Sequence, residues 1–149
     1  MSQTILPSDP SVSIGVLPRR FIALILDWIL IGLLGWAAAF FIVIFGILTL
    51  GVGWLFFHIM PAIPFAYYTL LIGGSGATPG QRAMGLTVRQ DVGLAHPTLP
   101  QAFVWSLLQA VSFVLACVPF LLMLLNPRHR AAHDILSGLT ILRAGRIPY

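Results

Sequence analysis

Lysine and glutamate are both absent from this chain of 149 residues. Charged residues make up 8% of the sequence, whereas soluble globular domains carry roughly 25%. All eight basic residues are arginine, and all four acidic residues are aspartate. So few charges cannot cover a water-exposed surface, because a chain of this size cannot bury all of its residues. The shortage argues against a soluble domain, a nucleic-acid-binding domain and a disordered tail.

Cysteine is equally scarce. The one cysteine, Cys117, lies in an apolar run, so the chain can form neither an intramolecular disulfide nor a cysteine-based metal cluster. Apolar residues are abundant instead: 58% of the chain is hydrophobic, and the mean hydropathy is +0.97. In such a chain, a net charge of +4 indicates arginines at a membrane surface rather than contacts with nucleic acid. We therefore expect an all-α membrane protein.

Residues 21–72 form the longest apolar run and contain one formal charge, Asp27. Because a membrane span needs roughly 20 residues, this run predicts two full transmembrane helices joined by a glycine-rich turn. We place the helices at about 21–45 and 52–72. Two prolines, Pro61 and Pro64, are expected to kink the second helix.

The first 18 residues contain three prolines and several serines, which predicts a flexible N-terminal arm over 1–18. Arg19, Arg20 and the apolar residues after them also match the outline of a signal peptide. Asp27 interrupts that apolar stretch, however, and hydrophobicity continues far beyond it. We therefore favour a retained helix.

A polar, glycine-rich loop over 73–98 precedes a third apolar segment over 99–125, which contains Pro119. This third segment is long for one span and short for two, so it either crosses once or is broken at the proline. A short basic C-terminal tail follows. We expect one membrane domain over 19–143, and a remaining tail over 144–149.

Arginine positions predict the orientation. Arg19 and Arg20 place the N-terminus in the cytoplasm, and two spans return the 73–98 loop to the same side. If the third segment crosses once, the arginines of the tail lie outside. If it forms a hairpin hinged near Pro119, they return to the cytoplasm. We favour the second arrangement, because the charge rule outweighs the length argument.

Asp27 is the most informative residue. It follows Arg20 by seven positions, so both lie on one helix face, with Asp27 about 10 Å inside the hydrocarbon. Insertion of an acidic residue at the centre of a membrane helix costs roughly 2.5–3.5 kcal/mol on insertion scales. We therefore expect Asp27 to have a partner. Asp27 is either part of a structural ion pair that holds the first helix against the cytoplasmic loops, or an ion or proton site whose charge state Arg20 tunes.

Histidines supply the remaining candidates. His58 and His133 are candidates for a proton relay, although we expect His58 and Asp27 to lie too far apart for direct contact. His129 and His133 have the i,i+4 spacing of a helical metal site, but the glutamate of a zincin motif is absent. We expect no metal site and no cofactor.

Three motifs resemble the RDD family of small bacterial membrane proteins, which is named for one Arg and two Asp residues. The family's Arg and first Asp correspond to Arg20 and Asp27, and its second Asp corresponds to Asp134 in His133-Asp134. Its middle loop resembles Gly-x-Thr-x-Gly-Lys followed by Gly-Leu-x-Val. The matching loop residues are Gly76, Thr78, Gly80 and Gly85, with Arg82 or Arg128 as the candidate substitute for a basic group.

The chain departs from this pattern at three positions. Gln81 stands at the usual loop lysine, Ile135 at the tail arginine and Leu139 at the tail threonine. The resemblance implies a multi-pass membrane fold, whereas the activity of the family is largely undefined. Transport of unidentified ligands is the usual suggestion, with cation/proton exchange proposed for some members.

Two functions follow as hypotheses. The first is a non-catalytic accessory or assembly subunit of a larger complex in the bacterial inner membrane, in which Arg20, Asp27 and Asp134 form a structural clamp. The alternative is a transport or ion-coupling component that uses Asp27. The sequence has no nucleophile–base pair or carboxylate pair, so we expect no enzyme activity and no catalytic residue. Expected partners are the lipid bilayer and either a protein subunit or further copies of the chain.

Overall fold

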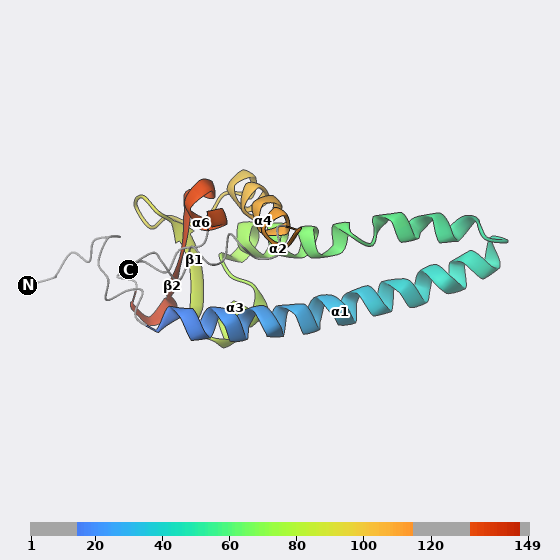
Figure 1. The fold of residues 1–149 in the computed structure, drawn as a ribbon, viewed down its shortest axis with the longest axis horizontal. Helices are drawn as coiled ribbons and strands as arrows, with labels where there is room; N and C mark the ends of the chain where they lie inside the picture. The colour runs from blue at the N-terminus through green and yellow to red at the C-terminus, as the bar shows by residue number, and fades with distance from the viewer. Residues whose placement is uncertain (1–14, 115–131, 147–149) are drawn as a thin grey trace, which may run out of the picture.

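A long helical hairpin dominates the computed structural model, which describes residues 15–114 and 132–146. Helix α1 (Val16–Leu48) forms one limb (Figure 1). The other limb consists of the 3-10 helix η2 (Val52–Ile59) followed by α2 (Ala62–Ser75). The apolar residues predicted as two spans therefore form the two limbs of one hairpin.

Helix α1 is longer than the predicted 21–45 and begins inside the predicted arm. Pro18 does not prevent this, because it lies in the first helical turn, where backbone N–H groups have no intrahelical partner. The portion from Asp27 to Leu48 is about 33 Å long at 1.5 Å per residue, enough to cross roughly 30 Å of hydrocarbon. Asp27 therefore lies at the end of the portion that can span.

The returning limb bends by 51° between η2 and α2. Pro61 stands at this break and has no N–H to continue the helical hydrogen bonds, which accounts for the predicted kink. Pro64 lies in the first turn of α2, where a missing N–H removes no intrahelical hydrogen bond. The predicted helix over 52–72 is thus two segments, the second of which continues to Ser75.

Shorter elements gather at the end of the hairpin where α1 begins. Helix α3 (Pro79–Ala83) and strand β1 (Leu86–Gln90) occupy the predicted loop, and α4 (Leu99–Val114) follows it. Helix α6 (Ala132–Ser137), strand β2 (Leu139–Arg143) and the short 3-10 helix η3 (Ala144–Arg146) form the last described segment. Cys117, Pro119 and the possible hinge in the third apolar segment lie outside the described residues.

Strands β1 and β2 pair in antiparallel register, with Val88 opposite Ile141 and Gln90 opposite Leu139. The fold is mostly helical, but this two-stranded sheet departs from the all-α class predicted above. The pairing also joins the glycine-rich loop to the C-terminal segment. Because paired strands must lie on one side of a bilayer, this is the arrangement that a same-side tail requires.

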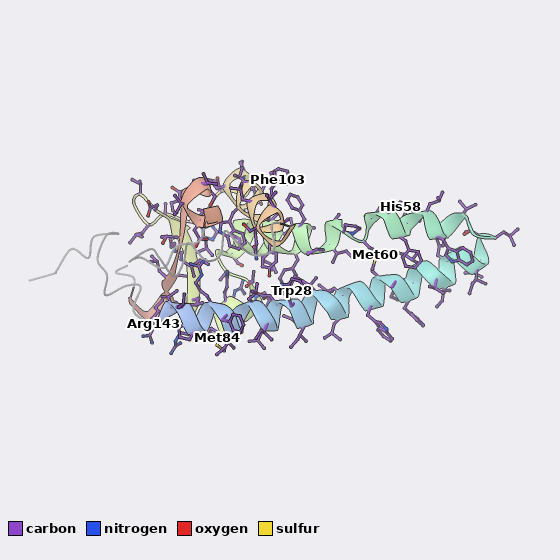
Figure 2. All side chains as sticks on the ribbon, viewed as in Figure 1. Trp28, His58, Met60, Met84, Phe103 and Arg143 are labelled. Carbon is purple, nitrogen blue, oxygen red and sulfur yellow. The ribbon has the colours of Figure 1, made fainter. Side chains whose placement is uncertain are left out.

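Buried side chains are concentrated at this end of the molecule. Tyr68 and Ile72 of α2 pack with Trp105 of α4 and with Val88 and Leu139 of the sheet. Along the rest of the hairpin, large apolar side chains are exposed (Figure 2). Helix α1 is long and apolar enough to cross a membrane, and the bent pair η2–α2 passes the same test if it forms one span. The exposed apolar surface is what a bilayer or another membrane subunit would cover.

Candidate functional site

The carboxylate of Asp27 is held by three donors from two other segments. It is 1% exposed. Its Oδ1 accepts hydrogen bonds from the Tyr67 hydroxyl at 2.8 Å and the Gly80 backbone N–H at 2.9 Å. Its Oδ2 accepts a bond from the Thr78 hydroxyl at 2.5 Å. These bonds compensate for the burial of a charged group and attach α1 to both α2 and α3.

The loop motif builds the donors that Asp27 uses. Thr78 is the N-cap of α3, and its Oγ1 accepts the Gln81 backbone N–H at 3.2 Å. The Gln81 side chain completes a capping box by accepting the Thr78 N–H at 3.0 Å. Gln81 thus has a structural role at the position where the resembled motif has lysine, because its Oε1 accepts a bond that an ammonium group cannot accept.

Gly80 permits the close approach of α3 to α1. A Cβ atom added there would lie 2.3 Å from the backbone oxygen of Ala23 and 2.8 Å from Cγ of Asp27. Gly76 and Gly85 serve different purposes, because both adopt positive φ, at 69° and 66° respectively. The three glycines of the motif are therefore required by backbone geometry and packing.

Arg20 and Asp134 form the second part of the site. Their side chains make an ion pair, and both are almost fully buried. The Trp105 indole N–H donates to Oδ1 of Asp134 at 2.8 Å. This arrangement ties α1 to α4 and α6. One helical position earlier, Arg19 donates from Nη1 to the Met84 carbonyl oxygen at 2.7 Å, which fixes the residues between α3 and β1.

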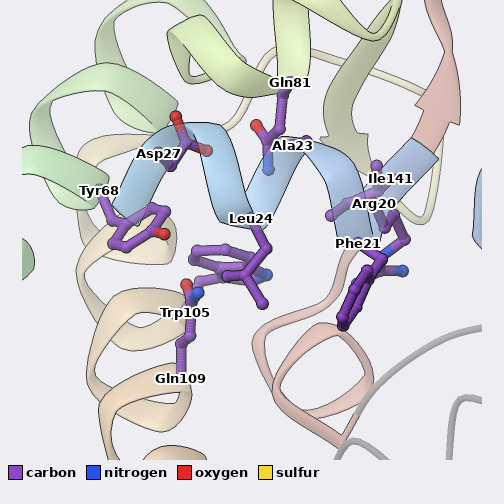
Figure 3. Close-up of a pocket in the computed structure, with 10 residues that line it drawn as sticks. All are labelled: Arg20, Phe21, Ala23, Leu24, Asp27, Tyr68, Gln81, Trp105, Gln109 and Ile141. Carbon is purple, nitrogen blue, oxygen red and sulfur yellow. The ribbon is translucent and has the colours of Figure 1, made fainter. Parts of the chain in front are cut away.

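The predicted cluster of Arg20, Asp27 and Asp134 is thus divided into two adjoining sets of contacts. Asp27 was expected to take part in a structural ion pair with the loops or to form an ion site. It accepts hydrogen bonds from Tyr67, Thr78 and Gly80 instead, and the ion pair forms between Arg20 and Asp134. Arg20 and Asp27 nevertheless line the same cavity. The close-up in Figure 3 shows its lining: Arg20, Phe21, Ala23, Leu24, Asp27, Tyr68, Gln81, Trp105, Gln109 and Ile141.

The other predicted site residues lie apart from this cavity or outside the described side chains. Arg82 is exposed and donates to the Ser75 hydroxyl, and it does not line the cavity. His58 is exposed on η2, further along the hairpin, where Nδ1 lies 3.0 Å from the Leu55 carbonyl oxygen (Figure 2). The side chain of His133 and all of His129 are outside the described part.

Sequence reasoning missed Tyr67, Trp105 and Gln109. Nothing local distinguishes these polar groups, because aromatic residues and glutamine are ordinary in apolar helices. Asp27 gave the one available signal, since a buried carboxylate requires donors. Within residues 15–112 and 134–145, whose side chains are described, no group of three or more His, Cys, Asp or Glu residues could hold a metal ion.

The comparisons with known proteins agree with the motifs. No curated protein and no solved structure matches the chain. The family model that does match is described as the RDD family and covers residues 14–138, a range that includes Arg20, Asp27 and Asp134. Because this range is most of the chain, the protein belongs to the RDD family.

Proposed function

We propose that this RDD protein is a non-catalytic accessory or assembly subunit of a larger complex in the bacterial inner membrane. The observation that carries the proposal is the use of its three signature charges. Arg20 and Asp134 neutralise each other, and Asp27 accepts bonds from three donors. All three hold segments of the chain together, which is the structural clamp.

The contacts of Asp27 favour this function over proton coupling. A residue that exchanges a proton must exist in both charge states during its cycle. The donors from Tyr67, Thr78 and Gly80 all belong to this chain, so both oxygens of the Asp27 carboxylate are engaged in contacts between its segments. The site is therefore suited to holding α3 in place.

The surface of the hairpin supports an assembly role. In the most apolar 18-residue stretch of α1, 6% of the residues are buried within the chain. Trp36 and Phe41 of this helix are among the exposed aromatic side chains. A subunit that packs against other membrane proteins offers this kind of surface, with the clamp keeping its polar end rigid.

Arginine placement supports a multi-pass orientation with a cytoplasmic N-terminus. Arg19 contacts the loop after α3, while Arg89 and Arg143 belong to the paired strands at the same end of the hairpin. The positive-inside rule assigns such an end to the cytoplasm. The turn between α1 and η2 would then face the periplasm.

Native co-purification tests the proposal. The tagged protein is extracted gently from its own membrane and analysed by native mass spectrometry. We expect a partner protein at fixed stoichiometry. A homogeneous assembly of this chain alone would contradict an accessory role.

Two glycine substitutions map the contact surface. A Cβ added at Gly32 of α1 or at Gly74 of α2 meets no atom within 4 Å, so both positions face open space within the chain itself. We expect Gly32→Leu to reduce partner recovery, because leucine prevents close helix approach within the membrane. Gly74→Leu, at the polar end, serves as the matched control.

A further inference from the structure

Arg89 on β1 is a partly buried basic side chain without a counter-charge among the described residues. Its guanidinium Nη1 is buried and makes no hydrogen bond. The carboxylate of Asp134 is paired with Arg20, and that of Asp27 accepts from three other donors. Asp91 follows Arg89 by two positions, but the described residues contain no ion pair between them. An arginine in this state lacks the acceptor that a bound anion would supply.

A second basic side chain lies at the same point. Gly76 is the C-cap of α2, and a Cβ atom added there would lie 2.9 Å from Nη1 of Arg89 and 3.2 Å from Nε2 of His96. The two side chains therefore converge on one glycine. Just before it in the chain, the Ser75 hydroxyl accepts a hydrogen bond from Arg82. Arg82, Arg89 and His96 thus form a basic cluster at the end of α2.

His96 has one ring nitrogen available to a ligand. Its Nδ1 lies 3.0 Å from the Pro97 carbonyl oxygen, which can only accept, so Nδ1 carries the hydrogen of this bond. Nε2 remains, and it donates to an anion when the ring is protonated. Because the His96 side chain is exposed and lies next to Nη1, a turn of this side chain gives a ligand access to the Arg89 guanidinium.

The basic cluster lies where the exposed apolar surface of the hairpin ends. Leu70 of α2 is exposed and precedes Gly76 by six residues, which is about 9 Å along a helix. Leu99 of α4 is also exposed, and its Cδ2 would lie 2.6 Å from a Cβ added at Gly73. With this apolar surface in the hydrocarbon, the cluster lies at the depth of the lipid headgroups, where anionic lipids carry phosphate groups.

Helix α2 offers another role for these charges. The C-terminal end of a helix carries a partial negative charge, and Arg89 and His96 lie beside the last turn of α2. That interaction still leaves Nη1 without a hydrogen-bond acceptor. A bound anion would provide one.

We infer that Arg89 and His96 bind a phosphate group at the end of α2. The guanidinium supplies paired N–H donors that match the oxygens of phosphate, and His96 supplies one more donor from Nε2. An anionic phospholipid headgroup and free inorganic phosphate present the same chemistry. This site is independent of the proposed accessory role, because it uses none of the clamp residues.

Arginine modification tests the site in the full-length protein. The protein in dodecyl maltoside micelles, which contain no phosphate, is treated with phenylglyoxal, and mass spectrometry follows the modification of each arginine. Phosphatidylglycerol, inorganic phosphate or sodium acetate is added to separate samples at matched ionic strength. We expect phosphatidylglycerol, inorganic phosphate or both to slow modification of Arg89 several-fold and to leave Arg143 unchanged. Arg143 is the matched control, because it is also a partly exposed arginine of the sheet.

The two phosphate compounds distinguish the sources of the bound group. Protection by phosphatidylglycerol alone assigns a lipid headgroup, whereas protection by inorganic phosphate assigns a site that is open to water. Where phosphatidylglycerol protects, Arg89→Gln should reduce the amount of this lipid retained in native mass spectrometry several-fold. Arg143→Gln should retain the wild-type amount.

Equal protection of Arg89 and Arg143 would show a general effect of anions on the protein surface and overturn the site. Acetate acting as well as phosphate would overturn the assignment of a phosphate group. No protection by either phosphate compound would overturn it too, leaving Arg89 as a charge beside the C-terminal end of α2. These measurements use the wild-type protein, so they decide the matter even if Arg89→Gln fails to fold.

Discussion

The Arg20 guanidinium and the Asp134 carboxylate form a buried ion pair between residues 114 positions apart in the chain. The pair connects α1 to α6, across the sheet end of the hairpin. Trp105 donates to the same carboxylate, so α4 is fixed at the same point. Arg20 and Asp134, together with Asp27, hold non-adjacent segments of this chain together.

Removing one charge of this pair should destabilise the fold strongly. In Asp134→Asn the remaining oxygen can still accept from Trp105, but Arg20 is left buried without its counter-charge. We expect a loss of about 3–5 kcal/mol, measured as reversible unfolding in mixed detergent micelles. Combining Asp134→Asn with Arg20→Met should recover part of the loss, since the unpaired charge is gone.

Arg82→Met is the matched control for this cycle, because Arg82 is exposed and its side chain donates to the nearby Ser75 hydroxyl. It should leave unfolding unchanged. Strict additivity of Asp134→Asn and Arg20→Met would contradict energetic coupling within the pair.

Asp27→Asn should loosen α3 without removing the apolar hairpin. Asparagine keeps one acceptor oxygen and replaces the other with an NH₂ group, which can only donate. A hydroxyl that donated to the carboxylate, such as that of Thr78, then faces another donor. We expect a cost of about 1–3 kcal/mol. Hydrogen exchange at the Gly80 amide should accelerate, because this N–H donates to Asp27.

Tyr67→Phe provides the comparison, since it removes one donor and leaves the carboxylate intact. Its effect should be smaller than that of Asp27→Asn. If Asp27→Asn kept wild-type stability and protection at Gly80, the clamp role of this residue would be wrong, and a role in ion coupling would gain support.

The charged residues show what the sequence could reveal. Asp27 was expected to have a partner because burial of a carboxylate in an apolar helix is costly. Which partner it has depends on chain segments 40 to 53 positions away, and helical spacing pointed to Arg20 instead. Spacing along one helix shows which residues lie on the same face. It does not show which other segments of the chain pack against that face in the tertiary fold.

The sheet was missed for a related reason. Leu86–Gln90 and Leu139–Arg143 are short strands, and each alone could belong to a loop or tail. They are stable only as a pair supported by the core below them. The sequence predicted a polar, glycine-rich loop over 73–98, whereas the capping box of Thr78 and Gln81 could have predicted α3 directly.

Gly80→Ala should disrupt the contact between α1 and α3. The added methyl group would meet the Ala23 carbonyl oxygen at 2.3 Å, and backbone atoms cannot move away as a flexible side chain can. We expect destabilisation of about 1–3 kcal/mol from overpacking, with faster proteolysis of the loop. Gly74→Ala is the control: its added methyl meets no atom, and alanine in a helix should stabilise by about 0.5–1 kcal/mol. Equal effects of the two substitutions would contradict the packing argument.

Single-cysteine labelling should place both strands on one side of the membrane. Single cysteines are introduced at Leu50, Val92 and Gly145 in a Cys117→Ser background. All three positions are exposed: Leu50, at 96%, lies in the hairpin turn, Val92 lies beside β1, and Gly145 lies beside β2. Because β1 pairs with β2, Val92→Cys and Gly145→Cys must share one side, whereas Leu50→Cys lies at the other end of the hairpin. An impermeant maleimide added to spheroplasts should label Leu50→Cys alone, and permeabilisation should expose the other two. Labelling of Gly145→Cys in intact spheroplasts, with Val92→Cys protected, would show that the tail and the loop lie on opposite sides and that the strands do not pair in the membrane.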